Sequence, residues 1–173
     1  LKTYAKSNHN TYYFLATADL NQRNLAKGIA HTFGYDAGGT YFEAMEDVVH
    51  FMKGTSDCLL IIDDAGKLNN KLFSRLQIIY DQTEGSAGII LAGTDELRRK
   101  LTRGANMGYS GMDEFLGRIC RWAPMDRPTL QDVERLAGQI GITNNRVILF
   151  LHKVCDNYRD LSFKYLDAAH DAA

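Results

Sequence analysis

Two adjacent carboxylates, Asp63 and Asp64, follow an uninterrupted apolar run that begins at Cys58. A short aliphatic run is typical of a strand that is buried on both faces, which favours a parallel sheet covered by helices. Ligands of such sheets bind at the carboxyl ends of the strands. In phosphoryl transfer, one carboxylate holds Mg²⁺ and a second orients the attacking water. We predict the first role for Asp63 and the second for Asp64; the alternative is a solvated turn after a buried strand.

A second apolar run, residues 88–92, predicts a neighbouring strand that leads into the polar residue Thr94. Farther along, Arg118 and Arg121 follow a stretch without apolar periodicity, residues 103–110, which we expect to be mobile until a ligand or a neighbour orders it. A fixed guanidinium suits the negative charge that develops in phosphoryl transfer. The alternative is that both arginines cap or solvate a short strand.

The order and spacing of these features resemble those of the AAA+ ATPases, especially the DNA-transposition helpers of the phage Mu B and TniB type. The resemblance covers nearly the whole chain and rests on residues 58–66, 88–97, 115–121 and 157–161. It implies an α/β fold with a three-layer core of the P-loop NTPase type, built on a parallel sheet, and a C-terminal all-helical lid. It also implies ATP and Mg²⁺ as cofactors.

The resemblance assigns roles to single residues. Asp63 and Asp64 stand at the family's Walker B motif, where Asp63 holds the Mg²⁺ of the nucleotide. Thr94 stands at the end of the sensor 1 strand, and Arg159 falls where a sensor 2 arginine points back at the nucleotide. All four side chains are therefore expected around bound ATP.

Arg118 corresponds to the family's arginine finger, which reaches the nucleotide of the adjacent subunit, and Arg121 is the competing candidate. An arginine that acts in trans requires a head-to-tail homo-oligomer, because the interface is heterologous and can propagate as a filament.

Two departures from the family pattern bear on enzymatic activity. The phosphate loop G-x-x-x-x-G-K-[ST] does not occur in the sequence, and residues 1–6 resemble the later part of a helix. We expect a strand and a phosphate loop upstream of Leu1; the alternative is a natural pseudo-ATPase. Asp64 stands where the family usually has Glu, so its shorter side chain would place the water less well and leave slow turnover or binding without turnover.

A net charge of −1 means that any contact with DNA must come from a local patch. The most basic cluster consists of Arg98, Arg99, Lys100 and Arg103. We predict that this cluster contacts DNA phosphates. The next candidate is a helix face that carries Lys67, Lys71 and Arg75, although a solvated face is the more common meaning of such a pattern.

Apolar periodicity predicts the elements that position these residues. Strands are expected at residues 11–16, 58–62 and 88–92, and helices at residues 20–33, 40–53 and 68–80. Thr40 and Glu43 have the spacing of a capping box, and Thr129 is a plausible N-cap of the first of three C-terminal helices. We predict a nucleotide-binding core at residues 1–125 and a helical lid at residues 126–173.

The composition agrees with a globular protein: 173 residues, 45% hydrophobic and 24% charged, with no run of transmembrane length. The three cysteines are far apart and form no C-x-x-C pair, so neither a disulfide framework nor a zinc site is expected. Cys58 and Cys155 lie in apolar patterns that suit a core in a reducing cytoplasm.

The sequence thus predicts a cytoplasmic, ATP-dependent DNA-binding protein that oligomerises on target DNA without strong sequence preference, assists a transposase and has no membrane contact. Two alternatives remain open. One is another AAA+ ATPase, of the secretion-associated or helicase-loader type. The other is an AAA+-like DNA-binding scaffold that does not hydrolyse ATP.

Overall fold

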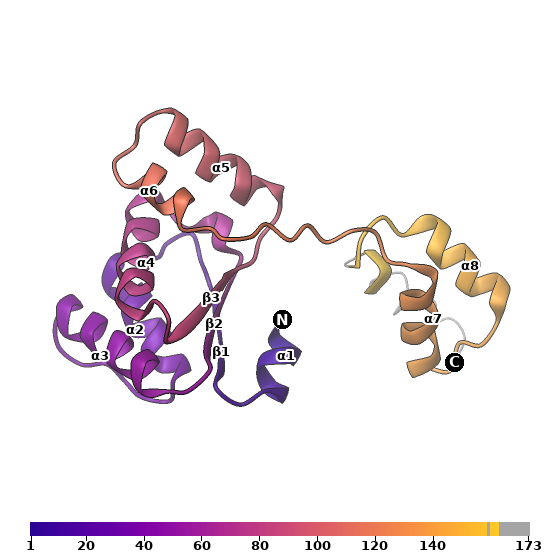
Figure 1. The fold of residues 1–173 in the computed structure, drawn as a ribbon. Coiled ribbons are helices and arrows are strands. Elements are labelled where there is room, and N and C mark those ends of the chain that lie inside the picture. Colours follow the sequence, from indigo (N-terminus) through magenta and orange to yellow (C-terminus); the bar gives the residue numbers. More distant parts are fainter. Residues whose placement is uncertain (159, 163–173) are drawn as a thin grey trace. The chain divides into compact units, whose positions relative to one another are not determined.

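The computed structural model describes residues 1–158 and 160–162 of the chain. The chain divides into two compact units, Leu1–Cys120 and Arg121–Ala173 (Figure 1). The predicted domain boundary after residue 125 lies in the segment 119–129, which forms no helix or strand. The first unit contains the sheet, and both helices α7 and α8 lie in the second.

A three-stranded parallel sheet forms the centre of the first unit, with the strand order β1-β2-β3. The strands are β1 (Thr11–Leu15), β2 (Cys58–Asp63) and β3 (Ala87–Leu91). The register pairs Leu15 with Asp63 and Ile62 with Leu91. The predicted α/β fold with a parallel sheet is therefore confirmed.

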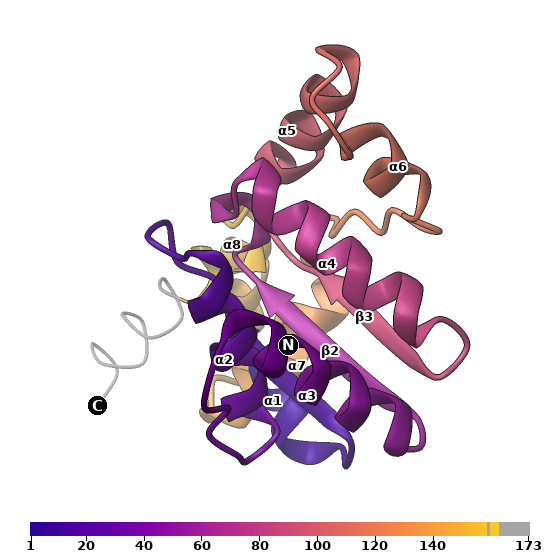
Figure 2. The ribbon, with the colours of Figure 1, turned by 90° about the vertical axis from the view of Figure 1, so that its left-hand side faces the viewer.

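Three helices cover one face of this sheet: α2 (Gln22–Thr32), α3 (Tyr41–Gly54) and α4 (Asn70–Thr83). Figures 1 and 2 show them together on that face, whereas the short helix α1 (Lys2–Ser7) lies against the other. Leu60 and Ile62 of β2 share one core with the apolar stripes of these helices, because alternate side chains of a strand point to the same face. The core residues from these elements are Leu25, Ile29, Val48, Met52, Leu60, Ile62, Phe73 and Ile79.

The three covering helices begin at the edge of the sheet where β1 and β2 end. Helix α2 is the next element after β1, α4 follows β2 after a short 3-10 turn, and α3 leads to the start of β2. Asn21 caps α2 and Asn69 caps α4 through side-chain oxygens that accept backbone N–H groups. Thr40 and Glu43 form the predicted capping box of α3, in which Glu43 Oε2 accepts the N–H of Thr40 at 2.6 Å. Each cap satisfies donors that the first turn of a helix leaves unpaired.

Residues 103–110, which show no apolar periodicity in the sequence, are helical as far as residue 106. Helix α5 (Asp95–Asn106) continues through Gly104, and α6 (Met112–Gly117) follows after a short turn. Gly104 is buried against Met112, where an added Cβ would lie 3.0 Å from the Met112 Cε atom. The glycine permits this close approach of the two helices, which the apolar periodicity alone does not indicate.

The second unit packs α7 (Leu130–Gln139) against α8 (Asn145–Val154). The predicted N-cap at Thr129 is confirmed and completes a capping box with Asp132. Its small core consists of Val133, Ala137, Ile148, Leu151, Cys155 and Leu161. Across the part of the chain that the structure describes, no helix is both long enough and apolar enough to cross a membrane.

Candidate functional site

The Asp63 carboxylate is fixed at the carboxyl end of β2 by two hydrogen bonds. Its Oδ2 atom accepts a hydrogen bond from the Tyr13 hydroxyl at 2.7 Å, and its Oδ1 atom accepts one from the backbone N–H of Asp64 at 2.9 Å. Tyr13 lies on β1, two residues before the register partner of Asp63, and therefore on the same face of the sheet. Each carboxylate oxygen keeps a second lone pair for a further ligand.

The Tyr13 hydroxyl stays protonated over the physiological pH range. Burial, then the hydrogen bond to Asp63 and the negative charges of Asp63 and Asp64, raise the pKa of Tyr13 to about 12. Tyr13 consequently acts as a permanent donor that sets the orientation of the Asp63 carboxylate.

Asp64 turns the chain away from the sheet. Its φ of 54° lies in the left-handed region, which Asp adopts more readily than most residues. The short helix η1 (Ala65–Lys67) follows, and the Lys67 ammonium lies 2.7 Å from Asp64 Oδ2. Both side chains of this ion pair are about half exposed, so the pair is readily exchanged for other partners.

The end of β3 runs beside this acidic turn. The backbone N–H of Ala92 donates to Ile62, and the carbonyl of Ala92 accepts from Ala65, both at 2.8 Å. Thr94 lies two residues farther on, as the exposed N-cap residue of α5, and its side chain makes no capping hydrogen bond. Thr94 therefore follows a backbone segment that is hydrogen-bonded to the residues on either side of the two carboxylates. It is an exposed residue.

Lys100 joins α5 to the same turn rather than extending into solvent. Its ammonium donates to the carbonyl oxygen of Gly66 in η1 at 2.9 Å. Of the other predicted DNA-contacting residues, Arg99 forms an exposed ion pair with Glu96 at 3.1 Å. Arg103 is exposed and, with Lys100, lines a cavity of about 290 Å³. The four cations thus share one helix but do not form one free cationic surface.

Arg118, the last of the candidates within the first unit, lies at the end of α6. Its Nε and Nη2 atoms donate to the two carboxylate oxygens of Asp81 at 2.8 and 3.3 Å, and this hydrogen bonding raises the pKa of the guanidinium. Asp81 is eleven residues along α4 from Asn70, which corresponds to about 16 Å of helix. Arg118 is consequently held near the far end of α4 from the Asp63 carboxylate of its own chain.

Two further arginines were predicted as site residues, and neither is placed at the site by the described residues. Arg121 is exposed and begins the second unit. Arg159, predicted as the sensor 2 arginine, lies outside the described residues. The structure thus brings Asp63, Asp64 and the backbone leading to Thr94 together, and it places Arg118 elsewhere in the same unit.

Tyr13 is the site residue that the sequence prediction missed. Residues 11–16 were predicted as a strand, but nothing in a single sequence states which residue of one strand stands beside Asp63 of another. The available signal was a tyrosine hydroxyl in a predicted strand, but Thr11 and Tyr12 of the same strand carry hydroxyls too.

The donor set at this edge suits a magnesium ion that arrives with a phosphate. Within the described residues, no three His, Cys, Asp or Glu side chains are grouped so that they could hold a metal ion by themselves. Mg²⁺ commonly binds one or two carboxylates and completes its octahedron with water and substrate phosphates. Asp63 and Asp64 supply that number of carboxylates, so they fit Mg²⁺ in the presence of a nucleotide.

Comparison with protein families matches an AAA domain to residues 1–101, which is more than half of the chain. The matched span includes all three strands, both carboxylates and Thr94. The chain belongs to the AAA domain family. None of the curated proteins matches it. AAA domains generally bind ATP with Mg²⁺, and membership agrees with the AAA+ part of the resemblance seen in the sequence. The match ends before Arg118 and the second unit.

Proposed function

We propose that this AAA domain belongs to an ATP-dependent DNA-binding protein that oligomerises on target DNA and assists a transposase. The AAA domain suggests an ATPase, and the Asp63 carboxylate at the end of β2 is the observation that carries the proposal. The transposition role is supported by the resemblance of residues 88–97 and 115–121 to the helper proteins of that type.

In this proposal, bound ATP with Mg²⁺ supplies the transferable phosphoryl group and the metal charge that stabilises the transition state. Asp63 would hold the metal, with its carboxylate in the orientation that Tyr13 sets. Asp64 orients the attacking water after it exchanges its exposed ion pair with Lys67 for that water. Thr94 offers a surface hydroxyl at the neighbouring strand end.

Arg118 acts on the nucleotide of an adjacent subunit in this proposal. Its ion pair with Asp81, at the far end of α4 from Asp63, supports a role in trans because the side chain cannot span that length of helix within its own subunit. Assembly is then head to tail, and the ion pair with Asp81 opens when a neighbour arrives.

The DNA-contacting surface in this proposal is α5, with Arg98, Arg99 and Arg103 as the phosphate contacts. Lys100 supports the surface indirectly, since it holds α5 against η1. Because η1 directly follows Asp64, this link also offers a physical route by which DNA contact can influence the carboxylates.

The experiment that tests the proposal measures ATP hydrolysis and assembly of the protein that carries this domain, with and without duplex DNA. We expect DNA to stimulate both, and Asp63→Asn to remove hydrolysis while DNA binding remains. Arg99→Gln with Arg103→Gln should weaken duplex binding equally for all sequences and should reduce the slope of log affinity against log salt by about 2. DNA binding that is independent of ATP in every respect favours the scaffold alternative instead.

A further inference from the structure

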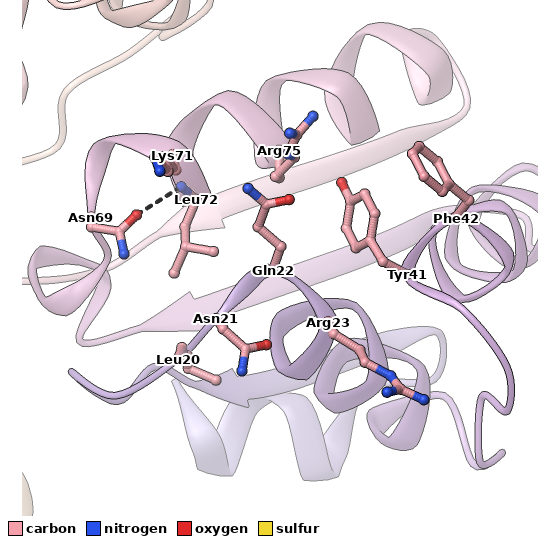
Figure 3. A pocket seen from close by; sticks show the side chains of 10 residues that line it. All are labelled: Leu20, Asn21, Gln22, Arg23, Tyr41, Phe42, Asn69, Lys71, Leu72 and Arg75. Atoms are coloured by element: carbon pink, nitrogen blue, oxygen red, sulfur yellow. Dashed lines mark hydrogen bonds between the residues drawn. The ribbon is translucent and has the colours of Figure 1, made fainter.

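A cavity of about 540 Å³ opens where the first turns of α2, α3 and α4 meet. Figure 3 shows Arg23 on the α2 side, Lys71 and Arg75 on the α4 side, and Tyr41 and Phe42 from α3. Among the residues that line this cavity, all of them described, three are cations and none is a carboxylate. A volume of this size is within the range of small-molecule pockets.

Within the described residues, the three cations of the cavity have no carboxylate partner. Arg23 donates to the backbone carbonyl of Gly39 at 2.8 Å rather than to a carboxylate, and the ion pairs of the described residues include none of the three. The Arg75 guanidinium lies over the Tyr41 ring, 5.4 Å from its centroid. Its Nε atom is buried and has no hydrogen-bond partner within the described part of the chain.

An unsatisfied charged donor is costly, so this arrangement favours an anionic acceptor. The starts of α2, α3 and α4 add to the positive potential, because the N-terminus of a helix carries a partial positive charge. Lys67, which the sequence placed on the same face as Lys71 and Arg75, is instead paired with Asp64. The cationic set therefore consists of Arg23, Lys71 and Arg75.

A large aromatic side chain stands beside these cations on the surface. Phe42 is 74% exposed, and its ring centroid lies 5.3 Å from that of Tyr41. Cations that hold the backbone, together with aromatic rings on which bases stack, are the combination by which proteins bind single-stranded nucleic acids. A duplex hides the faces of its bases, so only an unpaired base can use Phe42.

We propose that this cavity binds the phosphate backbone of a single-stranded nucleic acid, with Arg23, Lys71 and Arg75 as phosphate contacts, and that a neighbouring base stacks on Phe42. The site is separate from the Asp63 carboxylate and from the cations of α5, none of which lines the cavity. The proposal rests on the nucleic-acid-binding part of the proposed function and is independent of hydrolysis.

The first test measures the binding of a fluorescently labelled oligothymidylate by anisotropy at several salt concentrations, without nucleotide. Replacing Arg23, Lys71 and Arg75 with Gln should flatten the slope of log affinity against log salt by about 2, because fewer counterions are released from a single strand. The control replaces the exposed Lys2, Lys6 and Lys53 with Gln, which removes the same charge outside the cavity. Equal slopes for both triple variants would overturn the proposal.

The second test uses Phe42→Ala, which removes an exposed ring and should leave the fold intact, as circular dichroism will verify. We expect the affinity for oligothymidylate to fall by about 5- to 150-fold and the affinity for a duplex of equal length to change by less than about twofold. Phe150→Ala in α8, where the ring is also exposed, serves as the control and should change neither.

The outcomes separate this site from the proposed function. If the cavity variants bind oligothymidylate as the unaltered protein does, while the α5 variants lose duplex binding, the cavity is not a nucleic-acid site and the proposed function stands. If the unaltered protein binds neither strand nor duplex, both proposals fail. A loss for Phe42→Ala that is equal for strand and duplex would contradict base stacking.

Discussion

The two carboxylates at the end of β2 differ in what holds them. Asp63 is oriented by Tyr13, fifty residues away in sequence, whereas Asp64 is held by Lys67 only three residues farther on. A hydrogen-bond partner on another strand fixes a side chain relative to the sheet. A partner in the same turn can move together with that turn. Asp63 is therefore suited to a fixed role such as metal binding, and Asp64 to a role that requires movement.

Substitution of each carboxylate should separate these roles in the protein that carries the domain. Asp63→Asn removes the charge that a metal requires, and we expect Mg²⁺-dependent ATP hydrolysis to fall by on the order of 100-fold or more. Asp64→Glu keeps the charge and adds reach, so hydrolysis should be preserved or increased. Steady-state hydrolysis assays across Mg²⁺ concentrations will measure both effects, and complete loss of turnover in a folded Asp64→Glu protein would reverse the assignment.

Tyr13 should make the stability of the domain depend on alkaline pH. Its pKa is raised in the folded state, from 10.0 to about 12, so its contribution is complete below pH 10 and is lost as the pH rises toward 12. Tyr13→Phe cannot ionise, and its melting temperature should decline less than that of the unaltered protein over this window. Thermal unfolding at intervals between pH 9 and pH 12 tests the difference, and parallel declines would show that the Tyr13 pKa is not raised.

Residue types indicated the two carboxylates at a strand end, and the resemblance to AAA+ ATPases added Thr94 at the end of the next strand. They did not indicate Tyr13, whose position depends on the strand register, or the link from Lys100 to Gly66. A cation in a basic cluster and a cation that joins two elements have the same sequence pattern. Only the three-dimensional structure shows that Lys100 belongs to the second kind.

At the scale of elements, close packing depends on glycines inside helices. Gly28 faces β1 from α2, and a Cβ atom at this position would lie 2.5 Å from the Phe14 Cε2 atom. The Phe14 ring is buried in the core and has little room to move. The glycine therefore sets how closely α2, and with it one side of the cationic cavity, approaches the sheet.

Gly28→Ala should destabilise the domain by roughly 1–3 kcal/mol, because overpacking outweighs the gain of up to about 1 kcal/mol in helix propensity. Gly54→Ala is the matched control: it stands at the end of α3 with no atom within 4 Å of an added Cβ, and it should be neutral or slightly stabilising. Urea unfolding of both variants provides the comparison. Stabilisation by Gly28→Ala would mean that Phe14 moves aside at little cost.

The elements themselves were largely predictable from sequence. The three strands, the helices that cover them, the capping box at Thr40 and the N-cap at Thr129 follow from apolar period and local hydrogen-bonding chemistry. The continuation of α5 through Gly104 was not predictable, because glycine normally disfavours a helix interior. The cost of this glycine is offset by close packing against Met112 on the next helix. Packing against α6 therefore determines that α5 continues past Gly104.

At the scale of the molecule, Arg118 can be tested by mixing two inactive proteins. Arg118→Ala breaks an exposed ion pair and should change the melting temperature little, yet it should lower hydrolysis by on the order of 1,000-fold or more if the guanidinium acts across a subunit boundary. Asp63→Asn inactivates the other partner but keeps its Arg118.

Combining the two proteins should restore part of the activity, since some interfaces then pair an intact site with an intact arginine. Hydrolysis measured against the mixing ratio should pass through a maximum. If mixed oligomers form and activity does not return, Arg121 or a structural role for Arg118 takes its place. The Asp81→Asn variant gives a further comparison, because it frees Arg118 without removing it.

The order β1-β2-β3 leaves β1 and β3 each with an unpaired edge among the described residues. Neither strand contains a charged residue or a proline, and Ile90 of β3 is 41% exposed. Such edges are templates for the addition of a further strand and are a known source of aggregation. The purified chain should therefore aggregate more as its concentration rises. Ile90→Lys should reduce this aggregation.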